Sequence, residues 1–133
     1  MRRLSALCLL IALAACAVPA PAPQAAVPQG MDYPVYFSPW SAALDDTAQS
    51  ALQHATDAAK AALRGPIDVT GYADPTGSAQ ANVLLSQLRA QVVADQLIAD
   101  GVEPARITRH ARGATDFTLS AVESRRVTVS VGR

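Results

Sequence analysis

The sequence predicts a two-layer α/β sandwich of the α+β class, in which two helices cover one face of a mixed four-stranded sheet. Segments with helical apolar spacing alternate with segments that are apolar at every second position, in the order β-α-β-α-β-β. A strand–helix–strand passage requires a crossover that leaves its two strands parallel. The predicted strands carry polar side chains on one face, so we expect the helices on the other face only.

The first predicted strand is followed by a long helix. The run YPVYF at 33–37 is short, apolar and aromatic, which is typical of a strand. A helical pattern begins at Leu44, and Asp46 with Gln49 three residues later resembles a capping box. A Gly-Pro pair at 65–66 ends this helix. Its apolar stripe consists of Leu44, Ala48, Ala51, Leu52, Ala55, Ala59, Ala62 and Leu63.

The rest of the chain contains one more predicted helix and three more strands. IDVTGY at 67–72 alternates apolar and polar residues, as a half-buried strand does. The second helix spans 78–99 and stops before Gly101. RITRHARG at 106–113 and RRVTVSV at 125–131 are the last two predicted strands, and the final one alternates without interruption.

The amino terminus has the features of a secretory signal. Two arginines follow Met1, and the apolar run at 4–15 is too short to anchor the chain across a bilayer. LAAC at 13–16 resembles a bacterial lipobox, which implies cleavage before Cys16 and attachment of lipid to that residue. The alternative is an ordinary signal that is cut near Ala17 or Ala20.

Three parts of the chain are therefore expected: a signal peptide at 1–15, a lipidated Cys with a Pro/Ala-rich linker at 16–31, and one domain at 32–133. The signal removes two of the 11 basic residues and none of the 11 acidic ones, so the remainder is slightly acidic and nucleic acid is not expected as a partner. Because Cys8 leaves with the signal and Cys16 carries lipid, no disulfide is expected within the domain. The linker favours extended backbone, which would hold the domain away from a membrane.

The stretch GYADPTGSAQANVLLSQLRA at 71–90 places an acid and a base where they could form a binding site. Asp74 lies in a turn, and Arg89 lies on the next helix, whose side chains lean back toward that turn. Asp74 can accept hydrogen bonds from an ammonium group, and the Arg89 guanidinium matches a carboxylate. A ligand with both groups on one carbon, a free amino-acid centre, satisfies both. The alternative is a direct salt bridge between Asp74 and Arg89 that stabilises the fold.

Ligand binding and core packing are expected on different faces of this helix. Helical spacing places Asn82, Ser86 and Arg89 on one side. The adjacent side is expected to enter the core and contains Leu85, Leu88 and Val92. If the charged pair binds a ligand, replacing Asp74 or Arg89 removes binding and leaves the fold largely intact; if it only stabilises the fold, the stability falls instead.

The same stretch resembles the core motif of OmpA-like peptidoglycan-binding domains, especially those of peptidoglycan-associated lipoproteins. The family pattern is G-H-[TA]-D-x-x-G-x-x-x-x-N-x-x-L-[SG]-x-x-R-A, and Tyr72 stands here where His is usual. The likeness extends over 35–131, which is essentially the whole domain. The matching positions are Gly71, Ala73, Asp74, Gly77, Asn82, Leu85, Ser86, Arg89 and Ala90.

This resemblance implies a ligand and a set of contacts. Asp74 and Arg89 would bind the meso-diaminopimelate of the peptidoglycan stem peptide, whose side chain ends in a free amino-acid centre. The other residues that the resemblance places at the site are Thr76, Asn82 and Leu85, with Phe37 and Ser38 at the end of the first strand.

The resemblance and the lipobox together predict a lipoprotein on the periplasmic face of the outer membrane that binds peptidoglycan non-covalently and links membrane to wall. Ala17 stands where retention in the inner membrane would usually show Asp. The alternative is a protein-interaction scaffold of an envelope complex with weak or no peptidoglycan binding. Ser38, where the family often has Asp or Asn, and the short segment after Gly113 leave that alternative open.

The sequence does not predict an enzyme, and we expect neither a cofactor nor a metal. His54 and His110 are the two histidines, and no cysteine remains free, which is too few ligands for a metal cluster. A triad of Ser86, His110 and an aspartate has no motif to support it.

Overall fold

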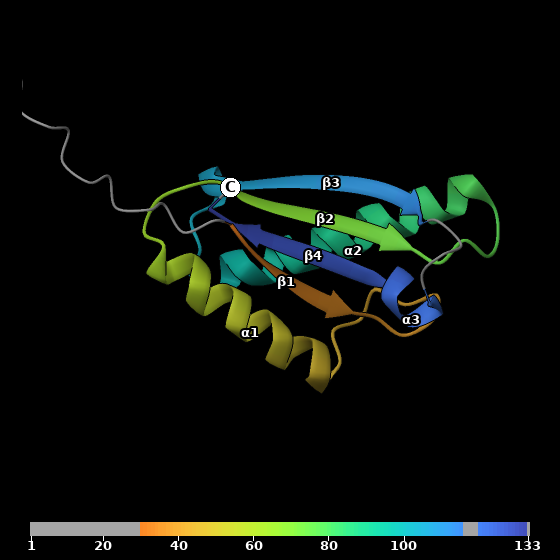
Figure 1. The fold of residues 1–133 in the computed structure, drawn as a ribbon, viewed down its shortest axis with the longest axis horizontal. Coiled ribbons are helices and arrows are strands. Elements are labelled where there is room, and N and C mark those ends of the chain that lie inside the picture. The colour runs from red at the N-terminus through yellow and green to blue at the C-terminus, as the bar shows by residue number, and fades with distance from the viewer. Residues whose placement is uncertain (1–29, 116–119, 133) are drawn as a thin grey trace, which may run out of the picture.

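The computed structural model of the protein describes residues 30–115 and 120–132. The predicted signal peptide, Cys16 and all but the end of the linker lie outside these residues. The described chain follows the predicted element order, with two short helices added, η1 and α3 (Figure 1). The elements are β1 (Met31–Tyr36), α1 (Asp46–Ala61), β2 (Ile67–Ala73), α2 (Ala79–Ala99), η1 (Pro104–Arg106), β3 (Ile107–Ala114), α3 (Ala121–Ser124) and β4 (Arg126–Val131).

The four strands form one mixed sheet in the order β1-β4-β2-β3. β2 and β3 are parallel neighbours joined through α2, as predicted for a strand–helix–strand passage. β4 lies between β1 and β2 and runs antiparallel to both. The amino-terminal end of β4 therefore lies beside the carboxyl-terminal ends of β1 and β2. The candidate site lies at this end of the sheet.

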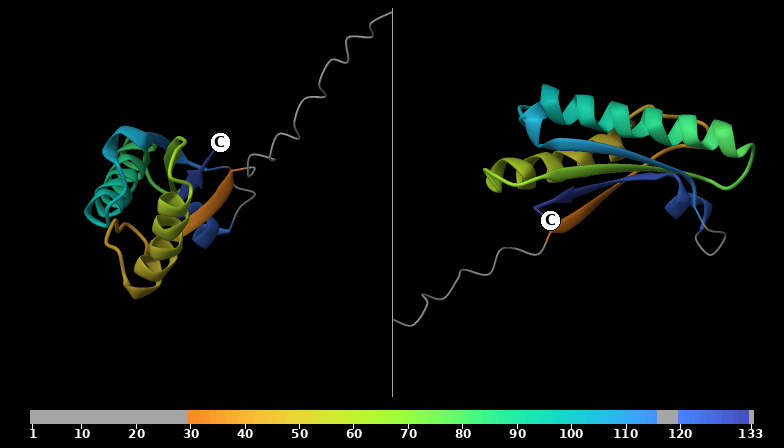
Figure 2. Two further views of the ribbon diagram at one scale, coloured as in Figure 1. Left: turned by 90° about the vertical axis from the view of Figure 1, so that its left-hand side faces the viewer. Right: turned by 90° about the horizontal axis from the view of Figure 1, so that it is seen from above.

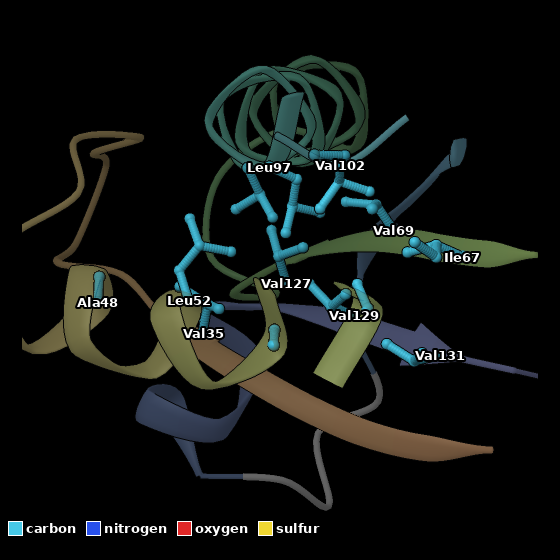
Figure 3. Packing of buried hydrophobic residues seen from close by; sticks show 14 of the residues in the cluster. Val35, Ala48, Leu52, Ile67, Val69, Leu97, Val102, Val127, Val129 and Val131 are labelled. Atoms are coloured by element: carbon cyan, nitrogen blue, oxygen red, sulfur yellow. The ribbon is translucent and has the colours of Figure 1, made fainter. Parts of the chain in front are cut away.

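Both long helices lie on the same face of the sheet, which confirms the predicted two-layer sandwich (Figure 2). α1 packs on β1 and β4, and α2 packs on β2 and β3. The core between the layers is aliphatic: side chains such as Leu52, Leu97, Val127 and Val129 point into it (Figure 3). β2 shows the predicted alternation, with every second residue buried under the helices. Within the described residues, no helix combines the length and the apolarity needed to cross a membrane.

The limits of α1 differ from the prediction at both ends. Asp45, not Asp46, caps the helix by accepting a hydrogen bond from the Ala48 N–H at 2.8 Å. The amide of Gln49 donates to the Leu44 carbonyl instead of closing a capping box. The helix ends at Ala61, because the chain turns away through Leu63, which has φ 49° and is 81% exposed. Leu63 thus does not belong to the core stripe that the sequence predicted.

Candidate functional site

A small pocket lies where β1, β2 and β4 meet the start of α2. Its volume is about 90 Å³, well below the roughly 300–1,000 Å³ of sites that enclose a whole small molecule. The pocket therefore suits the end of a side chain. Its lining consists of Pro39, Trp40, Asp74, Thr76, Asn82, Leu85, Arg89 and Arg125.

Five of the predicted site residues line this pocket, namely Asp74, Thr76, Asn82, Leu85 and Arg89. Phe37 and Ser38 lie behind the lining, where they contact Arg89. The guanidinium carbon of Arg89 is 5.3 Å from the centre of the Phe37 ring, and Nη2 donates to the Ser38 carbonyl at 3.1 Å. All seven predicted site residues thus lie close together, but Phe37 and Ser38 contact Arg89 and do not line the pocket.

Arg89 is fully buried, with 0% of its surface exposed. Besides the bond to Ser38, its Nε donates to the Ser41 carbonyl at 2.8 Å and its Nη1 donates to the Tyr72 carbonyl at 3.1 Å. These contacts hold the loop after β1 against the end of β2. Among the described residues, these contacts use three of the five N–H groups of the guanidinium, so one N–H on each terminal nitrogen remains for a ligand.

The surroundings of Arg89 disfavour its positive charge. Its pKa is lowered to about 10, mainly by burial and also by the neighbouring charge of Arg125, while the charge of Asp74 acts in the opposite direction. An anion that enters the pocket would relieve both unfavourable effects. The burial also makes Arg89 part of the fold, so its replacement cannot be expected to leave the structure intact.

The buried face of α2 is not the one predicted. Asn82, Ser86 and Arg89 do share a face, but that face points inward, and Leu88 is 53% exposed. Leu85 and Val92 are half-buried at the margin. The apolar residues that α2 buries are Ala90, Val93, Ala94 and Leu97.

Close contact with β2 explains the inward polar face. A Cβ on Gly71 would overlap the carbonyl oxygen of Ser86, so the helix approaches the strand where only glycine fits. A small serine suits this contact, and its hydroxyl is bonded on both sides. Ser86 Oγ donates to the Val83 carbonyl at 2.8 Å and accepts from the Gly113 N–H at 2.9 Å.

The turn before α2 orients Asp74. Asp74 Oδ1 accepts the Thr76 N–H at 2.9 Å, and this bond is the main reason why the pKa of the Asp74 carboxyl lies below its ordinary range. The amide of Asn82 donates to the Thr76 carbonyl at 3.0 Å and fixes the turn to the first helical turn of α2. The carboxylate of Asp74 is consequently ionised and aimed at the pocket.

The cation next to Asp74 is Arg125, not Arg89. Arg125 Nη1 lies 3.6 Å from Asp74 Oδ2, and its Nε donates to the Phe37 carbonyl at 3.3 Å. No ion pair joins Asp74 to Arg89 in the part of the chain that the structure describes, so the direct salt bridge weighed as an alternative is not present. The pocket contains two arginines and one carboxylate, and this excess of positive charge favours a ligand that carries a carboxylate.

Sequence reasoning did not identify Arg125. Arg125 directly precedes β4 and Arg126 begins it, and the alternation of an extended chain places the two side chains on opposite faces. Arg126 lies over the Tyr72 ring, 4.4 Å from its centre, on the face that the helices do not cover. Arg125 is directed to the pocket, and only the pairing of β4 with β1 and β2 brings it there.

The groups considered for catalysis are not brought together. Ser86 is buried between α2 and the sheet, whereas His110 Nε2 pairs with Asp68 Oδ1 at 3.1 Å on the open face. Among the described residues, no group of three or more His, Cys, Asp or Glu side chains is placed to hold a metal ion.

The sequence profile of the OmpA family matches residues 36–126, which include every residue that lines the pocket. The chain belongs to the OmpA family. Among its relatives, peptidoglycan-binding protein ArfA of Mycobacterium bovis is 38% identical over 69 residues, or 52% of this chain and 21% of that protein. Outer membrane protein 40 of Porphyromonas gingivalis is 38% identical over 87 residues, or 65% of this chain and 23% of that protein. The chain thus spans less than a quarter of either relative's length.

Solved structures of other OmpA-like domains share the fold. The peptidoglycan-associated lipoprotein from Burkholderia pseudomallei superposes with a TM-score of 0.65 at 27% identity, covering 73% of this chain and 87% of that chain. The cell wall anchor of the T6SS from Pseudomonas aeruginosa gives a TM-score of 0.56 at 32% identity, covering 72% of this chain and 73% of that chain.

Proposed function

We propose that this OmpA family domain binds peptidoglycan non-covalently by taking up the free amino-acid end of meso-diaminopimelate. The observation that carries the proposal is the arrangement of one carboxylate, Asp74, and two guanidinium groups, Arg89 and Arg125, around a pocket of about 90 Å³. An amino-acid end carries an ammonium and a carboxylate on one carbon, and so complements both kinds of charge. Two similar proteins, named as a peptidoglycan-binding protein and as a peptidoglycan-associated lipoprotein, support this ligand class.

Each group of the ligand has a partner in the pocket. The ammonium would donate to Asp74, whose carboxylate is already oriented by Thr76. The carboxylate would accept from the remaining N–H groups of Arg89 and from Arg125, which is only 15% exposed. Hydrogen bonds to charged groups are stronger than neutral ones, and burial strengthens them further.

Amidation of the diaminopimelate carboxylate is expected to weaken binding roughly 10- to 100-fold. It removes the charge and one acceptor opposite the arginines, and such a loss of a charged hydrogen bond costs about 1.5–3 kcal/mol. A stem peptide with Lys in place of diaminopimelate lacks the carboxylate and should bind as weakly. Titration calorimetry with the free, amidated and Lys-type stem peptides measures this difference. Equal affinities for all three would show that the arginines do not bind the ligand carboxylate.

Co-sedimentation with isolated sacculi separates this proposal from the scaffold alternative. A peptidoglycan-binding domain sediments with diaminopimelate-type sacculi and is displaced by free stem peptide. A scaffold that only binds envelope proteins stays in the supernatant.

We also propose that lipid on Cys16 anchors the protein to the outer membrane, facing the periplasm. One acyl chain gives only marginal membrane binding, whereas several chains make it lasting. The variant Cys16→Ala should therefore leave the membrane fraction for the soluble periplasm, or remain uncleaved. Fractionation of cells with an antibody to the domain measures this, with Cys8→Ala as the matched control that keeps the lipidation site. Wild-type protein in the soluble fraction would contradict the anchor.

A further inference from the structure

Trp40 occupies a backbone position that normally requires glycine. The Ser41 N–H bonds to the Ser38 carbonyl at 3.2 Å, so residues 38–41 form a tight turn with Pro39 and Trp40 in its centre. Trp40 has φ 53°, and positive φ at the second central position after proline is the condition for a type II turn, where glycine is usual. A bulky residue in this region is strained, and such strain is found most often at functional sites.

Two contacts hold Trp40 in this conformation. Arg89 binds both ends of its turn, through the Ser38 and Ser41 carbonyls. The indole lies against Gly77, where an added Cβ would be 2.8 Å from Cη2 of Trp40. Despite these contacts, Trp40 remains 63% exposed, so most of the ring is available to another molecule.

The lining of the pocket combines two kinds of side chain. Pro39, Trp40 and Leu85 are apolar, whereas one carboxylate and two guanidinium groups supply charge. Because the pocket is small, the part of a ligand behind its amino-acid end must lie outside it, where the exposed ring of Trp40 is available for contact. In diaminopimelate that part is an unbranched chain of methylene groups, which suits an indole face.

We propose that Trp40 is a ligand-contacting specificity residue whose indole covers the methylene chain behind the amino-acid end. This inference rests on the proposed function. It adds that the site also recognises the methylene chain next to the charged end of the ligand. The site would prefer an amino-acid end carried on a flexible methylene chain over the same end without such a chain, as in free alanine.

Fluorescence tests this contact directly, because Trp40 is the sole tryptophan of the chain. We expect a diaminopimelate-containing stem peptide to change the emission of the full-length protein with the midpoint that calorimetry gives. Trp40→Ala should weaken binding about tenfold, or about 1.4 kcal/mol, which corresponds to roughly 60 Å² of apolar surface removed from water. Trp40→Phe should recover part of the loss.

Two further variants separate binding from folding. Trp40→Gly suits the positive φ, so it should melt no lower than Trp40→Ala and still bind weakly. Leu63→Ala is the matched control, since Leu63 is also a large exposed residue with positive φ, at the opposite end of α1; it should bind as wild type does. Normal affinity of Trp40→Ala and Trp40→Gly, or unchanged emission at saturating peptide, overturns the inference. The proposed function would survive that result if Asp74→Asn still bound much more weakly than wild type, and would fail if Asp74→Asn bound normally.

Discussion

Replacing Arg89 with alanine is expected to abolish peptidoglycan binding and also to lower the free energy of unfolding by about 3 kcal/mol. The change removes the donor of three hydrogen bonds to the carbonyls of Ser38, Ser41 and Tyr72, and each buried acceptor left without a partner costs about 1–3 kcal/mol. For a domain of this size, the melting temperature should fall by more than about 10 °C. Calorimetric melting and co-sedimentation with sacculi, done below the melting temperature of the variant, measure both effects.

Arg106 provides a matched control for this prediction. It also donates to backbone carbonyls, with Nε 2.9 Å from the Gly65 oxygen and Nη1 2.9 Å from the Ala59 oxygen. It precedes β3, whose start lies at the end of the sheet opposite the pocket. Arg106→Ala should lose stability yet bind normally while folded. If Arg89→Ala melted like the wild type, the structural role of Arg89 would be wrong.

Replacing Asp74 with asparagine is expected to weaken binding strongly while leaving the domain folded. Asparagine can still accept the Thr76 N–H, so the turn is kept, but the negative charge opposite the ligand ammonium is lost. A loss of a charged partner predicts a roughly 10- to 100-fold weaker affinity. Calorimetric titration with stem peptide and thermal melting separate the two outcomes. The matched control is Asp68→Asn, since Asp68 pairs with His110 on the open face of the sheet.

The pH dependence provides a second test of Asp74. Its pKa is lowered from 3.8, first by the Thr76 N–H and also by the charge of Arg125, so the carboxylate stays ionised throughout the neutral and mildly acidic range. Binding should therefore change little between pH 7 and pH 5 and decline below about pH 4. The stability of the fold should change with pH in the same direction. A carboxyl group with a lowered pKa stabilises the folded state at pH values above its unfolded-state pKa, and this contribution is lost as the pH falls through the folded-state pKa. Loss of binding near pH 6 would contradict this role of Asp74.

The residues of the pocket that are close in sequence could be predicted from the sequence. Asp74, Thr76 and Asn82 lie in one turn and the helix that follows it, so local geometry is enough to place them together. The spacing also placed Arg89 on the same helical face as Asn82. It could not reveal that this face is buried, because the close approach of α2 to β2 depends on Gly71 and on the packing of the whole sheet.

The turn at 38–41 illustrates what local sequence conceals. The sequence does not indicate that Trp40 adopts a positive φ, because glycine is the usual residue at such a position and tryptophan rarely occurs there. Both ends of this turn are bound by Arg89, which lies 48 residues after Ser41 and 51 residues after Ser38. Long-range hydrogen bonds of this kind form only when the whole domain folds.

The sequence by itself determined the order of the elements, the covered face of the sheet and the acidic half of the site, because these follow from periodicity and from one continuous motif. Only the tertiary structure decided that Arg125 completes the pocket. β4 inserts between β1 and β2 and runs antiparallel to both, so its first residues meet the ends of those strands. The Phe37 N–H bonds to the Arg125 carbonyl at 2.8 Å, and this pairing brings the Arg125 side chain to Asp74.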